Sequence, residues 1–599
     1  MSDVSVAQQA AAWLDELAGA LAADSHEQVQ VLFAEDAEWR DIVAFTWDFS
    51  TVAGAGEITQ ALLRLNPQVG MTNLRIAANR TPPTEVSRAG EDVIEAIYEF
   101  DTIVGAGAGV VRLLPQDDGS TKARLISTTL QEIRGHEELR GPRRPKGTAY
   151  SRTFGGMNWL DQRVAEQQYQ DRQPDVVIVG GGQAGLSIAA RLRTLGVDAL
   201  IVEKLPRIGD VWRRRYHSLT LHNEVWVASF PYLEFPDTWP TFLPKDKLAG
   251  WMEYYAEAME LNVWTNSTVT GGNWDEESGS WNVEVNRGGE RVVLKPKHVV
   301  FGTGSVSGEP FIPHMPGLED FGGQVLHSSA YTSGTQYERC RALVVGTGTS
   351  GHDVAQDLHA LGSEVTIVQR NPTTVVSLEP SGVMVYALYS QGLALEDADL
   401  IAASNTYDTL IRANQLMTRL MVQHDAPLLE RLHAVGFRTD IGEDETGFHL
   451  KYNRRGGGYY INVGASDLIA DGEIGLLQHS EIARFTESGI LLADGSERNY
   501  DVVVFATGYR NQQEDVRALF GDEVAERVGP IWGVDERGEM RNMWRPTAQP
   551  GLWFHAGSLA ACRMNSKYLA LQIKADLEGM NPRTAELQRD LVGAKETVA

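Results

Sequence analysis

Cysteine is nearly absent from this chain, and its scarcity excludes one large class of redox site. Only Cys340 and Cys562 occur among 599 residues, and no C-x-x-C pair is present. A redox-active dithiol and a zinc site built on paired cysteines both need closely spaced thiols. The sequence therefore excludes dithiol chemistry, and no metal site is expected.

Long apolar runs and an excess of positive charge are also missing. No uninterrupted apolar stretch approaches the roughly 20 residues that a membrane helix needs. The N-terminal segment lacks the basic and apolar regions of a secretory signal. With 53 basic and 80 acidic residues the net charge is −27, so neither nucleic acid nor an anionic membrane is an expected partner. These absences predict a cytoplasmic protein.

Residues 1–140 are predicted to form a separate α+β domain. Apolar residues recur there at helical spacing and later alternate as in strands, notably over 93–104, 110–114 and 123–133. Residues 141–173 are rich in Arg, Gly, Pro and Gln, which predicts a linker with one short helix near 159–168. From residue 174 onward, apolar strands alternate with helical segments, as in an α/β fold.

A first glycine-rich loop follows an apolar run. Residues 176–185 read Val-Val-Ile-Val-Gly-Gly-Gly-Gln-Ala-Gly, which predicts a buried strand, a G-x-G-x-x-G turn and a helix. Gly180 permits the turn, Gly182 lets the backbone approach a pyrophosphate, and Gly185 lets the helix contact the strand. Glu203 ends the next strand about 20 residues on, where a carboxylate binds a ribose hydroxyl. A dinucleotide site is predicted; glycines that serve packing alone are the alternative.

A second loop of the same pattern occurs at residues 343–351, Leu-Val-Val-Gly-Thr-Gly-Thr-Ser-Gly. Thr349 and Ser350 are expected to bond pyrophosphate oxygens beside the loop amides. The following strand ends in Gln369-Arg370 and has no terminal acid. An arginine at that place binds a 2′-phosphate, so the pattern favours NADPH over NADH. A surface arginine at a strand end is the alternative.

Between the two loops, residues 321–331 read Phe-Gly-Gly-Gln-Val-Leu-His-Ser-Ser-Ala-Tyr. This segment resembles the F-x-G-x-x-x-H-x-x-x-W/Y fingerprint of the flavin-dependent monooxygenases of the flavin-containing and Baeyer–Villiger type. The resemblance extends over about residues 174 to 575. Residues 457–464 resemble the plant YUCCA-type enzymes. Residues 1–140 resemble a SnoaL-like or nuclear-transport-factor-like cone, as in bacterial type II flavin-containing monooxygenases.

This resemblance implies two Rossmann-like domains, one for FAD and one for NAD(P), after the α+β cone. The FAD domain is expected at 174–320 and 500–599, and the NAD(P) domain at 321–499 with a helical insertion at about 385–440. The implied cofactors are FAD and NADPH, with NADH as an open alternative. The implied reaction forms a C4a-(hydro)peroxyflavin from dioxygen and inserts one oxygen atom into a small organic substrate.

A ketone or other carbonyl substrate is favoured, as in Baeyer–Villiger oxidation. Heteroatom oxygenation, YUCCA-like oxidative decarboxylation of a 2-oxo acid and an NAD(P)H oxidase remain alternatives. So does a non-catalytic flavin-binding module, and a homodimer formed through the cone is left open.

Several residues acquire expected roles from the resemblance. Asn223 is the candidate polar group near the reacting oxygen, or else a turn residue. His327 is expected to be a hydrogen-bonded structural histidine, with proton transfer as the alternative. Arg563 is expected either to face substrate or to form an ion pair near a helix start. The expected cofactor-binding residues are Gly180, Gly182, Gln183, Ala184, Gly185, Glu203, Lys204, Trp212 and His222 for FAD, Gly346, Gly348, Thr349, Ser350, Gly351 and Arg370 for NADPH, and Thr507 and Gly508 at a crossover between the domains.

Overall fold

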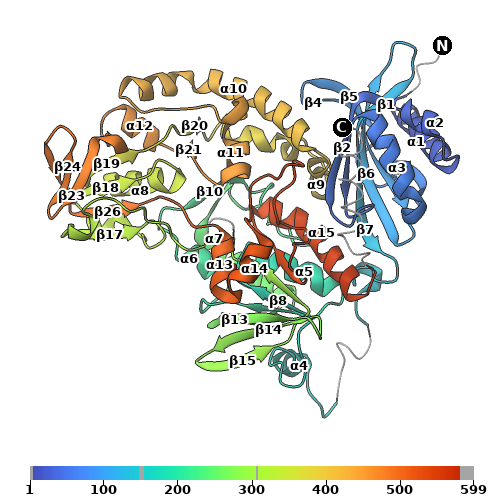
Figure 1. The fold of residues 1–599 in the computed structure, drawn as a ribbon, viewed down its shortest axis with the longest axis horizontal. Helices are drawn as coiled ribbons and strands as arrows, with labels where there is room; N and C mark the ends of the chain where they lie inside the picture. The colour runs from blue at the N-terminus through green and yellow to red at the C-terminus, as the bar shows by residue number, and fades with distance from the viewer. Residues whose placement is uncertain (1–4, 147–153, 305–307, 581–599) are drawn as a thin grey trace.

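The computed structural model describes residues 5–146, 154–304 and 308–580, and its elements fall into three units (Figure 1). One unit holds a seven-stranded sheet, and each of the other two is built on a five-stranded sheet. Both five-stranded sheets are wholly parallel, which accounts for their near-continuous Val, Leu and Ile runs. The mixed α/β fold with two Rossmann-like units is confirmed.

The N-terminal unit curves a mixed sheet around three helices. Its strand order is β2-β1-β7-β6-β5-β3, with β4 paired to β5. The helical spacings and alternating segments of the sequence correspond to these elements, whereas the likeness to a SnoaL-like cone stays a prediction. The elements are α1 (Val6–Ala22), α2 (His26–Gln30), β1 (Phe33–Ile42), β2 (Phe49–Ala53), α3 (Ala55–Val69), β3 (Thr72–Ile76), β4 (Thr84–Arg88), β5 (Glu91–Asp101), β6 (Gly105–Pro115) and β7 (Thr121–Ile133).

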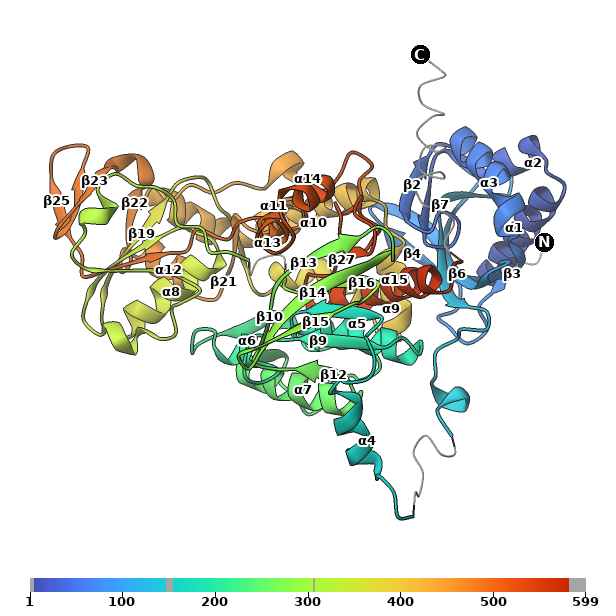
Figure 2. The ribbon, with the colours of Figure 1, turned by 60° about the horizontal axis from the view of Figure 1, so that its bottom comes forward.

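The first parallel sheet has the order β12-β9-β8-β16-β27. The first glycine loop joins its central strand β8 to helix α5, so the loop lies at the carboxyl edge of the sheet. Helix α15 contacts α5 on one side and strand β7 of the N-terminal unit on the other (Figure 2). The elements are β8 (Val176–Val179), α5 (Gln183–Thr194), β9 (Ala199–Val202), α6 (Asp210–Arg213), α7 (Lys245–Ala258), β12 (Asn262–Trp264), β16 (His298–Phe301), β27 (Leu552–Phe554) and α15 (Leu559–Leu577).

The second parallel sheet has the order β17-β26-β18-β19-β22. Strand β26 pairs with both β17 and β18, so it belongs to this second sheet. The expected return to the FAD domain at residue 500 is therefore wrong, because an apolar run alone does not say which sheet it joins. The chain returns to the first parallel sheet after β26, at strand β27. The elements are β17 (Gln324–His327), β18 (Arg341–Val345), α8 (Thr349–Ala360), β19 (Glu364–Gln369), β22 (Gly475–Gln478) and β26 (Val502–Phe505).

Helices fill the expected insertion, and the longest of them buries few apolar side chains. Met421 of helix α10 is buried, whereas its neighbour Leu420 is 50% exposed. Polar residues take the inner face: Asp425 accepts hydrogen bonds from Ser377, for example. The helix is therefore held by polar partners that a hydrophobic pattern does not reveal. The elements are β20 (Thr374–Ser377), η5 (Gly382–Ser390), α9 (Leu395–Ala403), α10 (Tyr407–Ala434), α11 (Gly447–Arg455) and β21 (Tyr459–Asn462).

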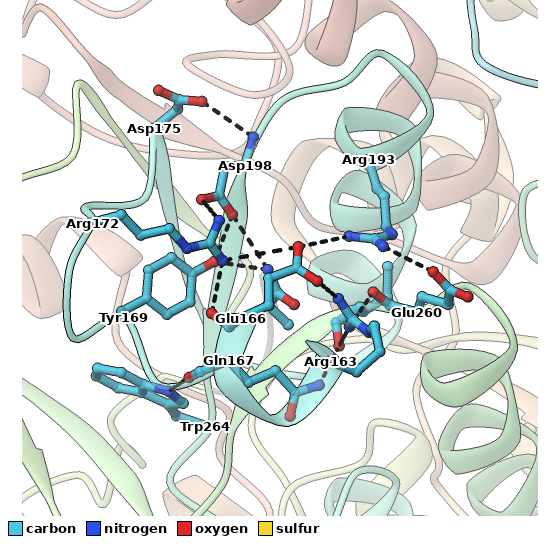
Figure 3. Close-up of polar contacts among 12 residues, drawn as sticks. Arg163, Glu166, Gln167, Tyr169, Arg172, Asp175, Arg193, Asp198, Glu260 and Trp264 are labelled. Atoms are coloured by element: carbon cyan, nitrogen blue, oxygen red, sulfur yellow. Dashed lines mark hydrogen bonds and ion pairs between the residues drawn. The ribbon is translucent and has the colours of Figure 1, made fainter. Parts of the chain in front are cut away.

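The second half of the expected linker is anchored to the first parallel sheet (Figure 3). Helix α4 (Trp159–Glu166) forms near the expected place. Beyond it, the Tyr169 hydroxyl donates to Asp198 at 2.6 Å, and Arg172 lies 2.7 Å from the same carboxylate. Trp264 donates its indole N–H to the Gln167 carbonyl at 2.7 Å. Residues 159–173 therefore belong to the first Rossmann-like unit, and 147–153 lie outside the described residues.

The N-terminal unit is joined to the rest of the chain by buried charges. The Arg545 guanidinium donates to both oxygens of Asp48, at 2.8 and 2.7 Å. These side chains are only 6% and 2% exposed. Arg40 pairs with Glu539 at 2.8 Å, and that carboxylate also accepts from Thr51 at 3.0 Å. Because each of the two carboxylates, Asp48 and Glu539, accepts more than one hydrogen bond, the two contacts fix the orientation of the N-terminal unit relative to the rest of the chain.

Candidate functional site

The first glycine loop has the backbone that a dinucleotide site requires. Gly180 has φ 102°, a conformation that favours glycine. A Cβ atom on Gly185 would lie 2.0 Å from the Gly180 carbonyl oxygen, so only glycine fits there. A Cβ on Gly182 would meet no described atom within 4 Å. The space over Gly182, next to the uncapped amides at the start of α5, is open for a phosphate.

Two further residues fit a flavin at this loop. The Glu203 carboxylate, buried at the end of β9, accepts from the backbone amides of Gly181 at 2.6 Å and Leu205 at 2.7 Å. Trp212 has a buried indole N–H with no hydrogen-bond partner among the described residues. A buried donor without a partner is costly, and the polar edge of a bound ligand would satisfy it. Ala184 is buried in α5, and Lys204 is exposed next to the acid.

The second loop repeats this geometry. Gly346 has φ 117°, and a Cβ on Gly351 would lie 2.0 Å from its carbonyl oxygen. A Cβ on Gly348 would meet only the Tyr459 carbonyl, at 3.9 Å. Helix α8 begins at Thr349, whose hydroxyl donates to that same carbonyl at 3.5 Å, and Ser350 follows in the first turn. The second loop is thus also open at its middle glycine and fits a second pyrophosphate.

Two arginines lie where the second loop would receive a 2′-phosphate. Arg370 is exposed directly after β19. Arg438 donates to the Arg370 carbonyl at 2.7 Å. Buried Gln369 holds the backbone of Arg438 through its amide group, donating at 2.8 Å and accepting at 2.9 Å. Sequence reasoning missed Arg438, because it lies at the end of the long insertion and no local motif marks it.

His327 braces the crossover between the two Rossmann-like units. One ring nitrogen lies 3.0 Å from the Gly508 carbonyl, so Nε2 carries the proton and donates. The other accepts from the Ser329 amide at 3.1 Å. Burial lowers the pKa of His327 from its ordinary value. Both nitrogens are therefore engaged by the chain, as the expected structural role requires. Thr507 bonds the Phe311 carbonyl beside this turn.

An aromatic cluster, defined here as Tyr386, Tyr452, Tyr459, Trp532 and Trp544, lies between the two loops. The Tyr452 and Trp532 rings are 5.4 Å apart, and the Trp532 and Trp544 rings are 6.4 Å apart. Tyr459 lies beside the second loop, as described above. The members of the aromatic cluster come from η5, α11, β21 and the segment before β27. Only the glycine-flanked segment at Tyr459 carried a sequence signal for this cluster.

The cluster also reaches the first loop. The Gln183 side chain donates to the Gly557 carbonyl at 3.4 Å, and a Cβ on Gly557 would lie 3.7 Å from Trp544. Asn223, in strand β10 (Thr220–Glu224), is hydrogen-bonded to the Tyr386 hydroxyl. The candidate polar group thus sits in a strand at the edge of the aromatic cluster, rather than in a turn.

Burial keeps the titratable groups around the cluster neutral at neutral pH. It raises the pKa of Tyr386 and of Tyr459, and it lowers the pKa of His222 to about 4. His449, whose ring lies 6.3 Å from that of Tyr386, also has a pKa lowered to about 4 by burial. These four side chains therefore offer hydrogen bonds in their neutral forms.

Arg563 has a structural explanation. Its guanidinium donates to both oxygens of Asp399, at 2.8 and 2.7 Å, and to the Val227 carbonyl at 2.7 Å. Of the two roles expected for it, the ion pair is the one that the structure shows. Within the described ranges, no three His, Cys, Asp or Glu side chains gather in a way that could hold a metal ion. None of the helices described there has the length and apolar character to cross a bilayer.

Comparisons with known proteins agree with this geometry. The family model of the pyridine nucleotide-disulphide oxidoreductases matches residues 168–392. Indole-3-pyruvate monooxygenase YUCCA1 of Oryza sativa subsp. japonica is 32% identical over 376 residues, covering 62% of this chain and 86% of the relative. Probable indole-3-pyruvate monooxygenase YUCCA4 of Arabidopsis thaliana is 31% identical over 348 residues, covering 57% and 77%.

Among solved structures, an open crystal structure of cyclohexanone monooxygenase is 16% identical with a TM-score of 0.50, over 69% of this chain and 91% of that one. At that identity the likeness concerns the fold alone. The rice relative, in contrast, is similar in sequence along most of its length. The open loops, the partnerless indole of Trp212 and this similarity lead to one conclusion: the chain belongs to the flavin-dependent monooxygenases, a family of oxidoreductases.

Proposed function

We propose that this chain is an FAD-containing, NADPH-using monooxygenase that inserts one oxygen atom of dioxygen into a small carbonyl compound. The observation that carries the proposal is the pair of glycine loops with open space over Gly182 and Gly348 and one aromatic cluster between them. When bound, FAD would accept a hydride from NADPH and activate dioxygen.

The two ends of the site support the choice of cofactors. Glu203 stands at the first loop, where an acid suits the ribose hydroxyls of FAD. Arg370 and Arg438 stand at the second, where an acid would repel a 2′-phosphate and arginines would bind it. NADPH is therefore the favoured reductant, and the remaining question of NADH use is one of relative affinity.

The aromatic cluster and Asn223 support a carbonyl substrate. The curated relatives are named for indole-3-pyruvate, a 2-oxo acid whose keto group is a carbonyl. Half-buried rings of Tyr386, Tyr452 and Tyr459 offer an apolar wall for such a molecule. The Asn223 amide lies beside the Tyr386 hydroxyl, so both groups can orient a carbonyl oxygen.

The residues of the chain have clear tasks in this scheme. The loop amides bind the pyrophosphates, and His327 holds the Gly508 turn that joins the two cofactor units. The aromatic cluster excludes water from the space between the loops, which limits the loss of reducing power to peroxide. Since His222 and His449 are neutral at pH 7, they contribute no fixed charge to that space.

Product analysis under isotopically labelled dioxygen tests the proposal. The FAD-loaded enzyme is supplied with NADPH and a panel of ketones and 2-oxo acids, and amines and sulfides serve as the comparison set. We expect one labelled oxygen atom in a product from the carbonyl panel. If labelled N- or S-oxides were the only labelled products, the substrate class would be amines or sulfides in place of carbonyl compounds. Stoichiometric hydrogen peroxide with no labelled product would replace the monooxygenase by an NAD(P)H oxidase.

A further inference from the structure

A cavity lies at the junction of the N-terminal unit, α9 and α15, away from both glycine loops. Its volume is about 630 Å³, within the range of small-molecule sites. Arg191, one of its lining residues, is near the end of α5, more than two turns beyond the loop at the start of that helix. No residue of either glycine loop lines it. The cavity is thus separate from the cofactor sites.

Charged side chains line part of this cavity, and most of them are already paired. Arg80 lies 3.0 Å from Asp397, and Arg143 lies 3.4 Å from Glu132. Arg191 and Arg140 each lie 3.5 Å from the carboxylate of Glu138. These cations therefore have carboxylate partners supplied by the chain itself.

Lys567 is the exception. This lysine of α15 forms no ion pair with any residue that the structure describes; its ammonium group donates to the side-chain oxygen of Gln131. Arg191 has a buried Nε–H without a hydrogen-bond partner among those residues. The cavity therefore holds one unpaired positive charge and one unused guanidinium donor.

Apolar side chains also line the cavity. Phe100 of β5 and Leu400 of α9 line it, together with Met564 and Tyr568 of α15. Of these, Phe100 and Tyr568 are almost fully buried, at 0% and 3% exposed. A flat or branched hydrocarbon group in the cavity would cover the half-buried Met564 side chain and gain packing contacts with the buried residues beside it.

We propose that this cavity is a binding site for a small organic carboxylate with an aromatic or aliphatic body, whose carboxylate pairs with Lys567. One free ammonium group matches one negative charge. Acidic residues also line the cavity, among them Glu99, Glu138 and Glu396, and they would repel a more highly charged anion such as phosphate. The site therefore selects a monoanion whose hydrocarbon part reaches Phe100 and Leu400.

The site is independent of the oxygenation chemistry, so binding alone tests it. Phenylacetate serves as the probe, phenylacetamide as its neutral analogue, and inorganic phosphate as the anion without a hydrocarbon part. Calorimetric titration of the full-length, FAD-loaded protein at pH 7 is expected to show that phenylacetate binds at least tenfold more tightly than either of the other two. Equal binding of the amide or of phosphate would overturn the proposal.

Substitutions on one helix locate the binding. Lys567→Gln keeps a polar group near Gln131 but removes the charge, and we expect a ten- to hundredfold loss of phenylacetate affinity, the range for one charge-assisted hydrogen bond. Lys574→Gln is the matched control, since Lys574 lies on the same helix and pairs with Glu578 at 2.6 Å. Asn223→Ala is the control for binding at the aromatic cluster, and it is expected to leave the phenylacetate affinity unchanged. Loss in either control, or none in Lys567→Gln, would refute the site.

The wild-type protein gives a second test that needs no variant. Burial and the nearby Arg191 lower the pKa of Lys567 to about 8, with Arg80 adding repulsion and Glu138 and Glu396 opposing it. The Lys567 ammonium group is positively charged below its pKa and loses that charge above it. The phenylacetate carboxylate stays ionised between pH 7 and pH 9.5. Affinity for phenylacetate should therefore fall roughly tenfold or more between pH 7 and pH 9.5. A constant affinity over this range would contradict a role for Lys567.

Discussion

The two glycine loops share a backbone and differ in the side chains around it. In each, the first glycine has a positive φ, the last leaves no room for a Cβ, and the middle one faces open space. After the first loop, Glu203 directly follows the next strand; after the second, the next strand ends in Gln369, with Arg370 and Arg438 beside it. We therefore expect the backbone of each loop to place a pyrophosphate and the residues at the end of the next strand to distinguish the two riboses.

A second difference lies inside the helices. When the loops are aligned by their glycines, Leu186 of α5 corresponds to His352 of α8, and both are fully buried. The His352 ring stacks on Tyr460 with centroids 3.9 Å apart and an interplanar angle of 8°. The first helix thus has an apolar side chain at the position where the second has a histidine. The same backbone accommodates both side chains, but only the histidine can take up a proton at low pH.

Substitutions that fill the open space over the middle glycines should have the largest effect, and they should affect a different cofactor at each loop. Gly182→Val places methyl groups where a phosphate would lie, so FAD affinity should fall about hundredfold or more and the flavin absorbance should be lost. Gly348→Val should retain FAD and lose reduction by NADPH. Gly250→Ala in α7 is the control, because its added Cβ also meets no described atom within 4 Å. Loss of flavin from both loop variants alike would contradict separate sites.

The arginines proposed to bind the 2′-phosphate should give the next largest effect. Arg370→Ala removes a charged donor near the 2′-phosphate, so the KM for NADPH should rise about ten- to hundredfold while the KM for NADH changes little. Arg341→Ala, which removes an exposed pair with Asp501 at 2.7 Å in the same unit, should leave both unchanged. Steady-state kinetics with each reductant decide the matter. An equal loss with NADH would refute the 2′-phosphate role.

Acid sensitivity should distinguish the two helices. Burial lowers the pKa of His352 to about 4, so the unfolded chain, with an ordinary pKa near 6.5, takes up a proton first as the pH falls. Stability contributed by neutral His352 is therefore complete above pH 6.5 and declines below it, by about 2 kcal/mol at pH 5. His352→Leu, copying Leu186, should reduce the decline in thermal midpoint between pH 7 and pH 5. An unchanged decline would mean that other buried histidines dominate.

The smallest effect is expected at the acid of the first loop. Glu203→Gln replaces one carboxylate oxygen by an amide group that faces a backbone N–H, so one of the bonds to Gly181 and Leu205 is lost. We expect FAD affinity to fall roughly fivefold, within the range for a single hydrogen bond. Glu253→Gln, at an exposed pair with Arg207, is the control. Fluorescence titration of the apoprotein with FAD measures both, and equal losses would show that the effect is not specific to the loop.

The sequence predicted the parts that depend on local chain geometry. Each G-x-G-x-x-G pattern requires a turn with a positive φ at its first glycine, and Gly180 and Gly346 both have it. His327 was expected to be a buried, hydrogen-bonded residue, and its two partners agree. These features follow from short segments whose residues have few other conformations.

Features that depend on distant segments were not predictable in the same way. Arg438 reaches Arg370 only because Gln369 binds its backbone across the insertion. The sheet to which β26 belongs depends on its neighbours β17 and β18, which an apolar run does not specify. The aromatic cluster joins residues from four segments, so no periodicity within one segment could reveal it.

The buried pair of Arg545 and Asp48 has a practical consequence for anyone who would shorten this protein. Removing the N-terminal unit would take Asp48 from the Arg545 guanidinium, only 6% exposed in the intact chain, and leave it with Asp535 as its remaining carboxylate partner. It would also strip Thr51 and Arg40 from Glu539. The loss of these charge-assisted hydrogen bonds would destabilise the segment that carries Arg545 and Glu539. Trp544, next to Arg545, belongs to the aromatic cluster, so a truncated enzyme would be damaged at its centre. Redesigns of the substrate range therefore need to carry the first 140 residues along as part of the catalytic body.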